Sequence, residues 1–247
     1  MKIFFIGLTW LIISAQVQGE NLPKSITLAS TDWCPYVCDN QPQKPGIIYE
    51  YLTHVLKDKG IELKVEFNAW HESVNKARIG QVDGLLTATP EEAPELIFTN
   101  TPTSDYQVCF ITKSDSRWLF KSTDSLSNVT MGSIKGYGYG EAVDQYINDN
   151  SHDKGMKIID EGGIERLNDM LFSEEIDTFL DDSLVVLWLL QNSNIKVKLA
   201  GCLKRNPFYI AVNPKFPWAK DFIKLMDEAL LENVNLQILN SIKQKYR

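Results

Sequence analysis

The chain contains 247 residues, with 25 lysines and arginines against 32 aspartates and glutamates, which gives a formal net charge of -7 at pH 7. Hydrophobic residues make up 44% of the chain, an ordinary value for a folded protein. These values exclude a disordered chain, a collagen-like repeat and a basic nucleic-acid binder as descriptions of the whole chain. The length is sufficient for one large domain or for two lobes with buried cores.

Residues 1–19 have the pattern of a secretory signal peptide. Lys2 supplies the early positive charge, residues 3–15 are almost wholly apolar, and Val17 and Gly19 are small enough to precede a cleavage site. The alternative is a retained membrane anchor, but the apolar run is short for a complete span. No later segment is long and apolar enough to cross a bilayer, so we expect residues 20–247 to be a soluble exported protein, periplasmic in a bacterium.

In chain order, the hydrophobic periodicity predicts a strand at 25–29, a helix from 48 that Gly60 closes, a strand at 61–67, a helix at 72–79, and strands at 82–87 and 108–112. A strand at 129–134, a helix at 141–147, a strand at 156–159, a helix at 164–172, a strand at 176–180 and a helix at 184–190 follow. Late strands at 197–199 and 208–212 precede helices at 218–231 and 236–245. Strands that alternate with helices predict parallel sheets covered by helices.

The four cysteines, Cys34, Cys38, Cys109 and Cys202, form an even set that export would allow to pair. Three pairings are possible. A turn around Pro35 could bring Cys34 and Cys38 together, which leaves Cys109 with Cys202, each in or beside a predicted strand. The alternative is a set of buried free thiols. No histidine lies near these cysteines in the sequence, so a metal site is disfavoured.

A glycine-rich segment, Ser-Ile-Lys-Gly-Tyr-Gly-Tyr-Gly at 133–140, lies between a predicted strand and a predicted helix. Its glycines allow close approach of the backbone, and the helix that follows presents unpaired N–H groups, so the segment is a physical anion site. It lacks the lysine and the Ser/Thr ending of a nucleotide P-loop. An ordinary tight turn is the alternative.

An ordered set of motifs covers nearly all of residues 20–247. It comprises Gly46-Ile-Ile-Tyr-Glu50, Trp70, Gly80-Gln-Val-Asp83-Gly84, Thr89, Phe98-Thr99, the glycine-rich turn, Ile-Asp-Thr-Phe-Leu-Asp-Asp at 176–182 and Phe-Tyr-Ile-Ala-Val at 208–212. In this order and spacing the motifs resemble the bacterial extracellular solute-binding proteins of family 3, which serve the uptake of polar amino acids.

The resemblance implies a two-lobed α/β fold of the periplasmic-binding-protein type II, with the ligand in a cleft between lobes that two strands join. Mapped onto this sequence, the first lobe would hold residues 20–105 and 204–247, and the second lobe residues 106–203. Cys109 and Cys202 would then lie next to the two crossings, which supports their pairing.

The resemblance also implies a ligand site. Aromatic rings at Trp33 and Tyr36, beside Asp32, would supply contact area and cation–π attraction, and Trp70 is expected to be a core residue. The matching aspartate of the family takes the ligand's α-ammonium group; here it is Asp182, with Asp181 as the competing candidate and a helix N-cap as the structural alternative. The candidate ligand-binding residues are Asp32, Trp33, Tyr36, Thr87, Thr89, Glu92, Gly136, Tyr137, Gly138, Tyr139, Gly140 and Asp182.

One departure concerns the ligand. Amino-acid binders of the family carry an arginine three residues after the threonine matched by Thr89, where it grips the α-carboxylate. This chain has Glu92 there. A cationic or amine-bearing ligand therefore fits better than a standard amino acid, unless Glu91 and Glu92 begin a solvated helix after Pro90.

The function that follows is reversible capture of a small polar solute by a monomer, without cofactor, metal or nucleic acid, for an ABC-type importer or a membrane sensor. The alternative is a periplasmic enzyme of the same fold, such as a dehydratase. The chain lacks the His-Glu-x-x-His zinc pattern and the Gly-x-Ser-x-Gly nucleophile turn.

Overall fold

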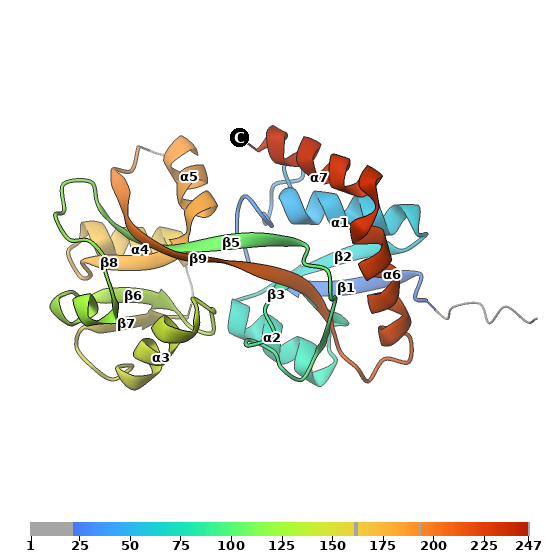
Figure 1. The fold of residues 1–247 in the computed structure, drawn as a ribbon, viewed down its shortest axis with the longest axis horizontal. Helices are drawn as coiled ribbons and strands as arrows, with labels where there is room; N and C mark the ends of the chain where they lie inside the picture. The colour runs from blue at the N-terminus through green and yellow to red at the C-terminus, as the bar shows by residue number, and fades with distance from the viewer. Residues whose placement is uncertain (1–21, 161–162, 193, 247) are drawn as a thin grey trace, which may run out of the picture.

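The computed structural model describes residues 22–160, 163–192 and 194–246, so the expected signal peptide lies outside the described residues. The chain forms two lobes that lie side by side (Figure 1). The first lobe contains β1 (Ser25–Ser30), α1 (Ile47–Asp58), β2 (Glu62–Phe67), α2 (Trp70–Ile79), β3 (Gly84–Ala88), β4 (Ile97–Phe98), α6 (Ala219–Leu231) and α7 (Asn233–Lys245). The second contains the 3-10 helix η1 (Thr123–Asn128), β6 (Met131–Ile134), α3 (Glu141–Asp149), β7 (Met156–Ile159), α4 (Gly163–Phe172), β8 (Thr178–Asp182) and α5 (Ser183–Asn192).

Two long strands, β5 (Ser104–Lys113) and β9 (Val197–Val212), run through both lobes and join them (Figure 1). They pair with each other in antiparallel register along most of their length. β9 also pairs with β3 and β4 in the first lobe, and β5 pairs with β8 in the second. Among the described residues the strands form one sheet in the order β2-β1-β3-β9-β5-β8-β6-β7, with β4 on β9.

The prediction of parallel sheets is correct only for the strands away from the crossing. β1 pairs in parallel with β2 and β3, and β6 pairs in parallel with β7 and β8. β5 carries the chain out of the first lobe and β9 returns it, so the two crossing strands run in opposite directions and pair antiparallel with each other. β9 also pairs antiparallel with β3, and β5 with β8. The result is a mixed sheet in each lobe.

The prediction of separate strands at 197–199 and 208–212 is wrong, since β9 is continuous. The sequence between them, Ala-Gly-Cys-Leu-Lys-Arg-Asn-Pro, shows no strand alternation and contains both a glycine and a proline. These residues form a strand because β5 pairs with them. Such pairing is a tertiary effect, and the local strand propensity of the sequence does not predict it.

The loop before α1 is held firmly against that helix. The backbone N–H groups of Ile47 and Ile48, which a helix start leaves without intrahelical partners, donate to the carbonyls of Pro35 and Tyr36. Gly46 has φ 111°, and a Cβ there would lie 2.5 Å from the Tyr36 carbonyl oxygen. Glycine at this position therefore allows the loop that carries Trp33 to sit directly on the start of α1.

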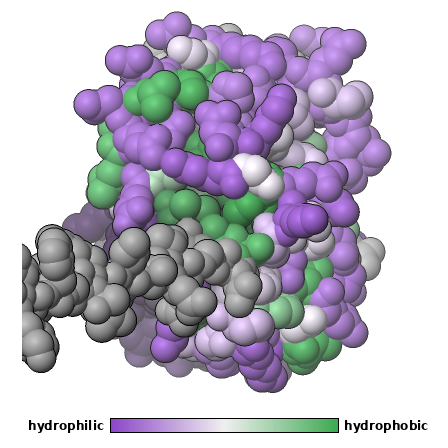
Figure 2. All heavy atoms as spheres, turned by 90° about the vertical axis from the view of Figure 1, so that its right-hand side faces the viewer, coloured by the Kyte–Doolittle hydropathy of each residue, from purple (hydrophilic) through white to green (hydrophobic). Residues whose placement is uncertain are grey.

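One cluster of buried apolar residues runs through both lobes. It includes Leu28, Leu52 and Phe222 of the first lobe and Met131 of the second. Phe179 and Leu167 belong to a further cluster in the second lobe. On the face at the α6 end of the molecule, hydrophilic residues predominate, with hydrophobic patches between them (Figure 2). Within the described ranges, no helix has both the length and the apolar character needed to cross a membrane.

Candidate ligand-binding site

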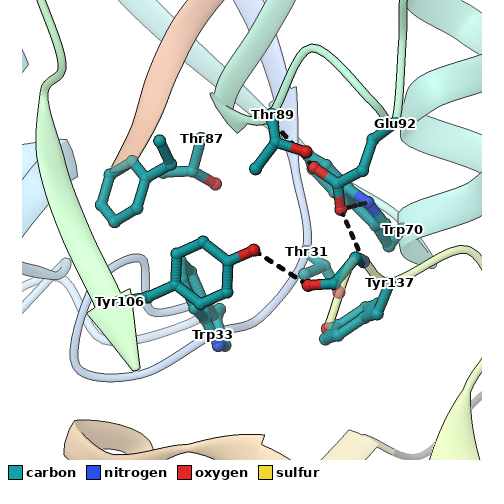
Figure 3. A pocket seen from close by; sticks show the side chains of 10 residues that line it. Thr31, Trp33, Trp70, Thr87, Thr89, Glu92, Tyr106 and Tyr137 are labelled. Carbon is teal, nitrogen blue, oxygen red and sulfur yellow. Dashed lines mark hydrogen bonds between the residues drawn. The ribbon is translucent and has the colours of Figure 1, made fainter. Parts of the chain in front are cut away.

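A small cavity of about 50 Å³ lies where the two lobes meet at the crossing strands (Figure 3). The first lobe contributes residues that follow β1 and β3, at the carboxyl ends of parallel strands, the edge at which open α/β sheets bind ligands. The crossing strands contribute an aromatic ring each, and the second lobe contributes its glycine-rich turn. The lining residues are Thr31, Trp33, Trp70, Thr87, Thr89, Glu92, Tyr106, Tyr137, Gly138 and Phe208.

The walls of this cavity are mainly aromatic. The Trp33 ring stacks on Tyr36 with centroids 4.3 Å apart and meets Phe208 edge-on at 5.7 Å. Across the cleft, Trp70 meets Tyr137 of the second lobe edge-on at 6.5 Å. Rings held by one another in this way form a rigid apolar surface that can also attract a cation.

Acidic residues surround the wider hollows that adjoin the cavity. A hollow of about 240 Å³ shares Trp33 and Tyr137 with it and adds Asp32, Glu165 and Asp181. Two more hollows, of about 360 Å³ and 980 Å³, are lined among others by Asp39, Asp160, Glu91, Glu141, Asp144 and Asp149. Of the residues that the structure describes, no lysine or arginine lines any of these four spaces. The cleft therefore presents negative charge beside aromatic rings.

Glu92 lies at the centre of the cleft. Its Oε1 accepts hydrogen bonds from the Trp70 indole Nε1 at 2.9 Å and from the Gly138 backbone N–H at 3.0 Å, and its Oε2 accepts one from the Thr89 backbone N–H at 2.8 Å. Burial raises the pKa of Glu92 to about 7, although these hydrogen bonds lower it. The solvated helix start that the sequence allows as an alternative is not formed here.

Asp181 and Asp182 have different roles. Asp182 accepts backbone N–H groups from Gln107, Leu184 and Val185, so its carboxylate caps the start of α5 and ties it to β5. Asp181 lines the 240 Å³ hollow and is 5% exposed. Burial raises its pKa to about 8, although hydrogen bonds from the Asp182 N–H and Trp33 lower it. Asp181 therefore lines the hollow, and the carboxylate of Asp182 is engaged by the backbone instead.

Three further candidates do not line the central cavity. Tyr36 is buried beneath Trp33, which it supports by stacking. The Tyr139 hydroxyl accepts the Ile134 backbone N–H at 2.7 Å inside the second lobe. Gly136 lies against His71, whose Cβ would be 3.2 Å from a Cβ at this glycine. None of these three residues lines the central cavity or the three hollows beside it.

The remaining candidates lie at the cleft. Trp33, Thr87, Thr89, Glu92, Tyr137 and Gly138 line the central cavity, Asp32 lines the hollow next to it, and Gly140 lines the 980 Å³ hollow. Trp70 is a core residue as expected, 4% exposed, but its indole edge also reaches the cavity.

Sequence reasoning missed Tyr106 and Phe208, which come from the crossing strands. Their aromatic side chains lie at strand positions where the sequence pattern predicts a buried core residue as readily as a ligand-binding one. The signal that could have found them is their place beside the two proposed lobe crossings, where both lobes are within reach.

Disulfides link Cys34 with Cys38 and Cys109 with Cys202. The first lies in the turn that carries Trp33, and the second joins β5 to β9. No group of three or more His, Cys, Asp or Glu side chains within the described ranges has the arrangement of a metal site.

Comparison with known proteins finds similarity in structure alone. No protein-family model and no curated protein sequence matches the chain. Among solved structures, an ancestral arginine-binding protein bound to arginine has a TM-score of 0.74 at 19% identity, over 91% of this chain and 98% of that one. A histidine kinase sensor domain with similarity to periplasmic binding proteins also has a TM-score of 0.74, at 15% identity, over 90% of this chain and 95% of that one. A putative L-cystine ABC transporter protein from Listeria monocytogenes gives 0.74 at 17% identity, over 90% and 95% of the two chains.

These neighbours cover nearly the whole described chain, both lobes and both crossing strands included. Their identities are too low to carry more than the architecture. The chain therefore has the two-lobed α/β fold of the periplasmic binding proteins.

Proposed function

We propose that this protein is an exported solute-binding protein that captures a small organic cation between its two lobes, without covalent chemistry. The observation that carries the proposal is the cleft itself, where aromatic rings from both lobes stand beside Asp32, Glu165 and Asp181 and no lysine or arginine among the described residues lines the space. An organic cation gains from both kinds of wall, through cation–π attraction and through charge-assisted hydrogen bonds.

The lobes that close on the ligand are residues 20–105 with 204–247, and residues 106–203. This division is supported by the pairing of β9, which joins β5 up to Phe208 and joins β3 and β4 from Tyr209 onward. Closure of such lobes is a hinge motion in which the ligand favours the closed state.

The space available sets the size of the solute. The central cavity of about 50 Å³ holds only a small group, while the adjoining hollow of about 240 Å³ can hold an extended chain. A linear amine or guanidine fits this shape, with its cationic end between Trp33, Tyr137 and the carboxylate of Asp181.

The setting is extracytoplasmic. The signal-peptide pattern at 1–19 and the two disulfides fit export to an oxidising compartment such as the periplasm. The fold neighbours include both an ABC transporter protein and a kinase sensor domain. The same capture of a solute could therefore precede either delivery to an ABC permease or signalling to a membrane sensor. We infer a binding protein and not an enzyme, since the fold neighbours include an arginine-binding protein, and we expect it to act as a monomer.

A matched panel of ligands tests the proposal. Agmatine, cadaverine and putrescine are the decarboxylated forms of arginine, lysine and ornithine, so each pair differs only in the carboxylate. Binding to the purified protein is measured by calorimetry and by thermal shift, since a ligand of the native state raises the melting temperature. In at least one pair, the amine should bind more tightly than the amino acid. Asp181→Asn should weaken that binding. No response to any cation in the panel would overturn the proposal.

A further inference from the structure

Three backbone N–H groups of the glycine-rich turn are already occupied by carboxylates of this same chain. The Gly138 N–H donates to Glu92 at 3.0 Å. The Tyr139 and Gly140 N–H groups donate to the two oxygens of Asp144 at 2.9 Å and 3.0 Å. The segment is therefore an anion site, as its sequence predicts, but the anions are side chains of the protein.

Glu92 differs from Asp144 because one of its hydrogen bonds, from the Gly138 N–H, crosses the cleft. Asp144 belongs to α3 and caps its own helix, whereas Glu92 belongs to the first lobe and Gly138 to the second. The contact is close: a Cβ at position 138 would lie 3.3 Å from Cγ of Glu92, so a larger residue would press on the Glu92 side chain. The other two donors to Glu92, Trp70 and Thr89, are in the first lobe. One carboxylate thus joins both lobes at the point where a bound solute would have to do so.

We propose that the Glu92 carboxylate acts as an internal ligand of the cleft: it occupies the position that a solute's carboxylate would take, bridges the lobes, and makes the site select amines over the corresponding amino acids. The selectivity rests on the proposed function, whereas the bridge between the lobes does not.

The selectivity follows from the donors and the charges at this position. A solute carboxylate would have to displace Glu92 from Gly138, Thr89 and Trp70, and would then meet the displaced charge itself. Glu91, Asp144 and the phenols of Tyr106 and Tyr137 are the other titratable groups around this position. The Arg78 guanidinium bonds to Glu95 and to the Glu92 backbone carbonyl, not to the Glu92 carboxylate. Specificity of this kind comes from repulsion of the wrong ligand as much as from attraction of the right one.

A purely local role for Glu92 has to be distinguished from this one. Its bond to the Thr89 N–H spans three residues and could simply fix the turn after β3. A local role would not involve the second lobe, so removal of the Glu92 side chain would leave the separation of the two lobes unchanged. The compactness of Glu92→Ala, and its recovery in acetate, therefore separates the two roles.

The first experiment uses the ligand-free protein. Glu92→Ala should expand the molecule in small-angle scattering and lower its melting temperature, because Gly138 loses its partner across the cleft. Sodium acetate should restore both values in Glu92→Ala, while acetamide and sodium chloride at equal concentration should not, and the wild type should not respond to acetate. Glu91→Ala is the matched control, since Glu91 is an exposed neighbour outside the hydrogen-bond set of Glu92. A Glu92→Ala protein that stays as compact as the wild type, or that acetate and acetamide rescue equally, would overturn the bridge.

The second experiment measures selectivity as the ratio of agmatine to arginine affinity. The wild type should favour agmatine by about tenfold or more, which is the size of one charge-assisted contact. Glu92→Ala should lose most of that ratio, chiefly by a gain in arginine affinity. Should Glu92→Ala fail to fold, the isosteric Glu92→Gln should still lower the ratio, because it removes the charge. An unchanged ratio in the variant that folds would overturn the selectivity.

The two proposals fail differently. If neither agmatine nor any other cation binds the wild type but acetate rescues Glu92→Ala, the bridge stands while the proposed ligand class and the selectivity fall. If amines bind but acetate does not rescue, the proposed function stands and the internal ligand falls.

Discussion

The Tyr106 hydroxyl donates a hydrogen bond of 2.9 Å to the Gly138 carbonyl, so Gly138 is held through its N–H by Glu92 and through its carbonyl by Tyr106. Tyr106 lies on β5, and Gly138 lies in the turn that follows β6. Two hydrogen bonds at Gly138 thus hold the turn, one to β5 through Tyr106 and one to the first lobe through Glu92.

Removal of the Tyr106 hydroxyl should loosen this arrangement without disturbing the core. Tyr106→Phe keeps the ring, which is 8% exposed, and leaves the Gly138 carbonyl without its partner. We expect the free energy of unfolding to fall by about 1–3 kcal/mol, measured by chemical denaturation. Tyr209→Phe, on β9, is the control: its ring packs on Phe98, and the loss should be smaller. Equal losses in the two variants would argue against a special role for Tyr106.

The two adjacent aspartates of β8 should separate into a structural and a binding residue. Asp182→Ala removes the acceptor of three backbone N–H groups and should lower the free energy of unfolding by about 1–3 kcal/mol. Asp181→Asn should change stability less and weaken the binding of agmatine, because a bound cation would favour the ionised form of the Asp181 carboxyl in this hollow, and asparagine cannot ionise. Urea denaturation and calorimetry on both variants test this pair. Agmatine affinity that depends on Asp182 and not on Asp181 would reverse the assignment.

Stability should fall as the pH rises from about 4 to about 8. Burial raises the pKa of Glu92 to about 7 and that of Asp181 to about 8, whereas both carboxyls have pKa values near 4 in the unfolded chain. Between these limits the folded state binds more protons than the unfolded state, so the free energy of unfolding declines as protons are removed and levels off above the folded pKa values.

Urea denaturation at pH 5, 6, 7 and 8 measures this decline. Glu92→Gln should flatten it mainly below pH 7, and Asp181→Asn should flatten its upper part. A free energy of unfolding that rises between pH 5 and pH 8 would contradict the prediction.

The two disulfides should contribute unequally to stability. Cys109 and Cys202 are 93 residues apart in sequence, and closing so long a loop restricts the unfolded chain strongly, so replacing both with serine should cost about 2–5 kcal/mol. Cys34 and Cys38 are only four residues apart, so the corresponding double variant should lose much less. Its effect should appear instead as weaker agmatine binding, because the turn that carries Trp33 is no longer tied. Denaturant midpoints that shift equally in the two double variants would contradict this ranking.

The sequence predicts the elements of this fold better than their connection. The hydrophobic pattern finds the alternating strands and helices of each lobe, because most helices have one apolar face and strands such as β3 and β8 are short buried segments. It does not find that residues 200–207 continue a strand, since their pairing with β5 depends on a partner about 90 residues away. The short strand β4 and the 3-10 helix η1 also escape, because each is too short to show a period.

The sequence predicts which segments of the chain form the site, but not which side chains of those segments face the cleft. Trp33, Thr89, Glu92 and Gly138 follow from motif order, and all four lie at the cavity. Which of Asp181 and Asp182 faces the cleft depends on a single residue of register, and local sequence does not determine that. That Glu92 fills the anion site of the glycine-rich turn requires the two lobes to be placed together, although the residues on each side are visible in the sequence.

The paired crossing strands have a mechanical consequence. β5 and β9 form a two-stranded ribbon whose hydrogen bonding is irregular on either side of Cys109, where the disulfide to Cys202 clamps it. Bending stiffness is greatest at such a clamp, so separation of the lobes would have to flex the unclamped span between it and β3, where Tyr106 and Phe208 stand. Tyr106 and Phe208, which line the cavity, would then move with the flexing span. A ligand in the cleft would therefore change the curvature of the ribbon directly.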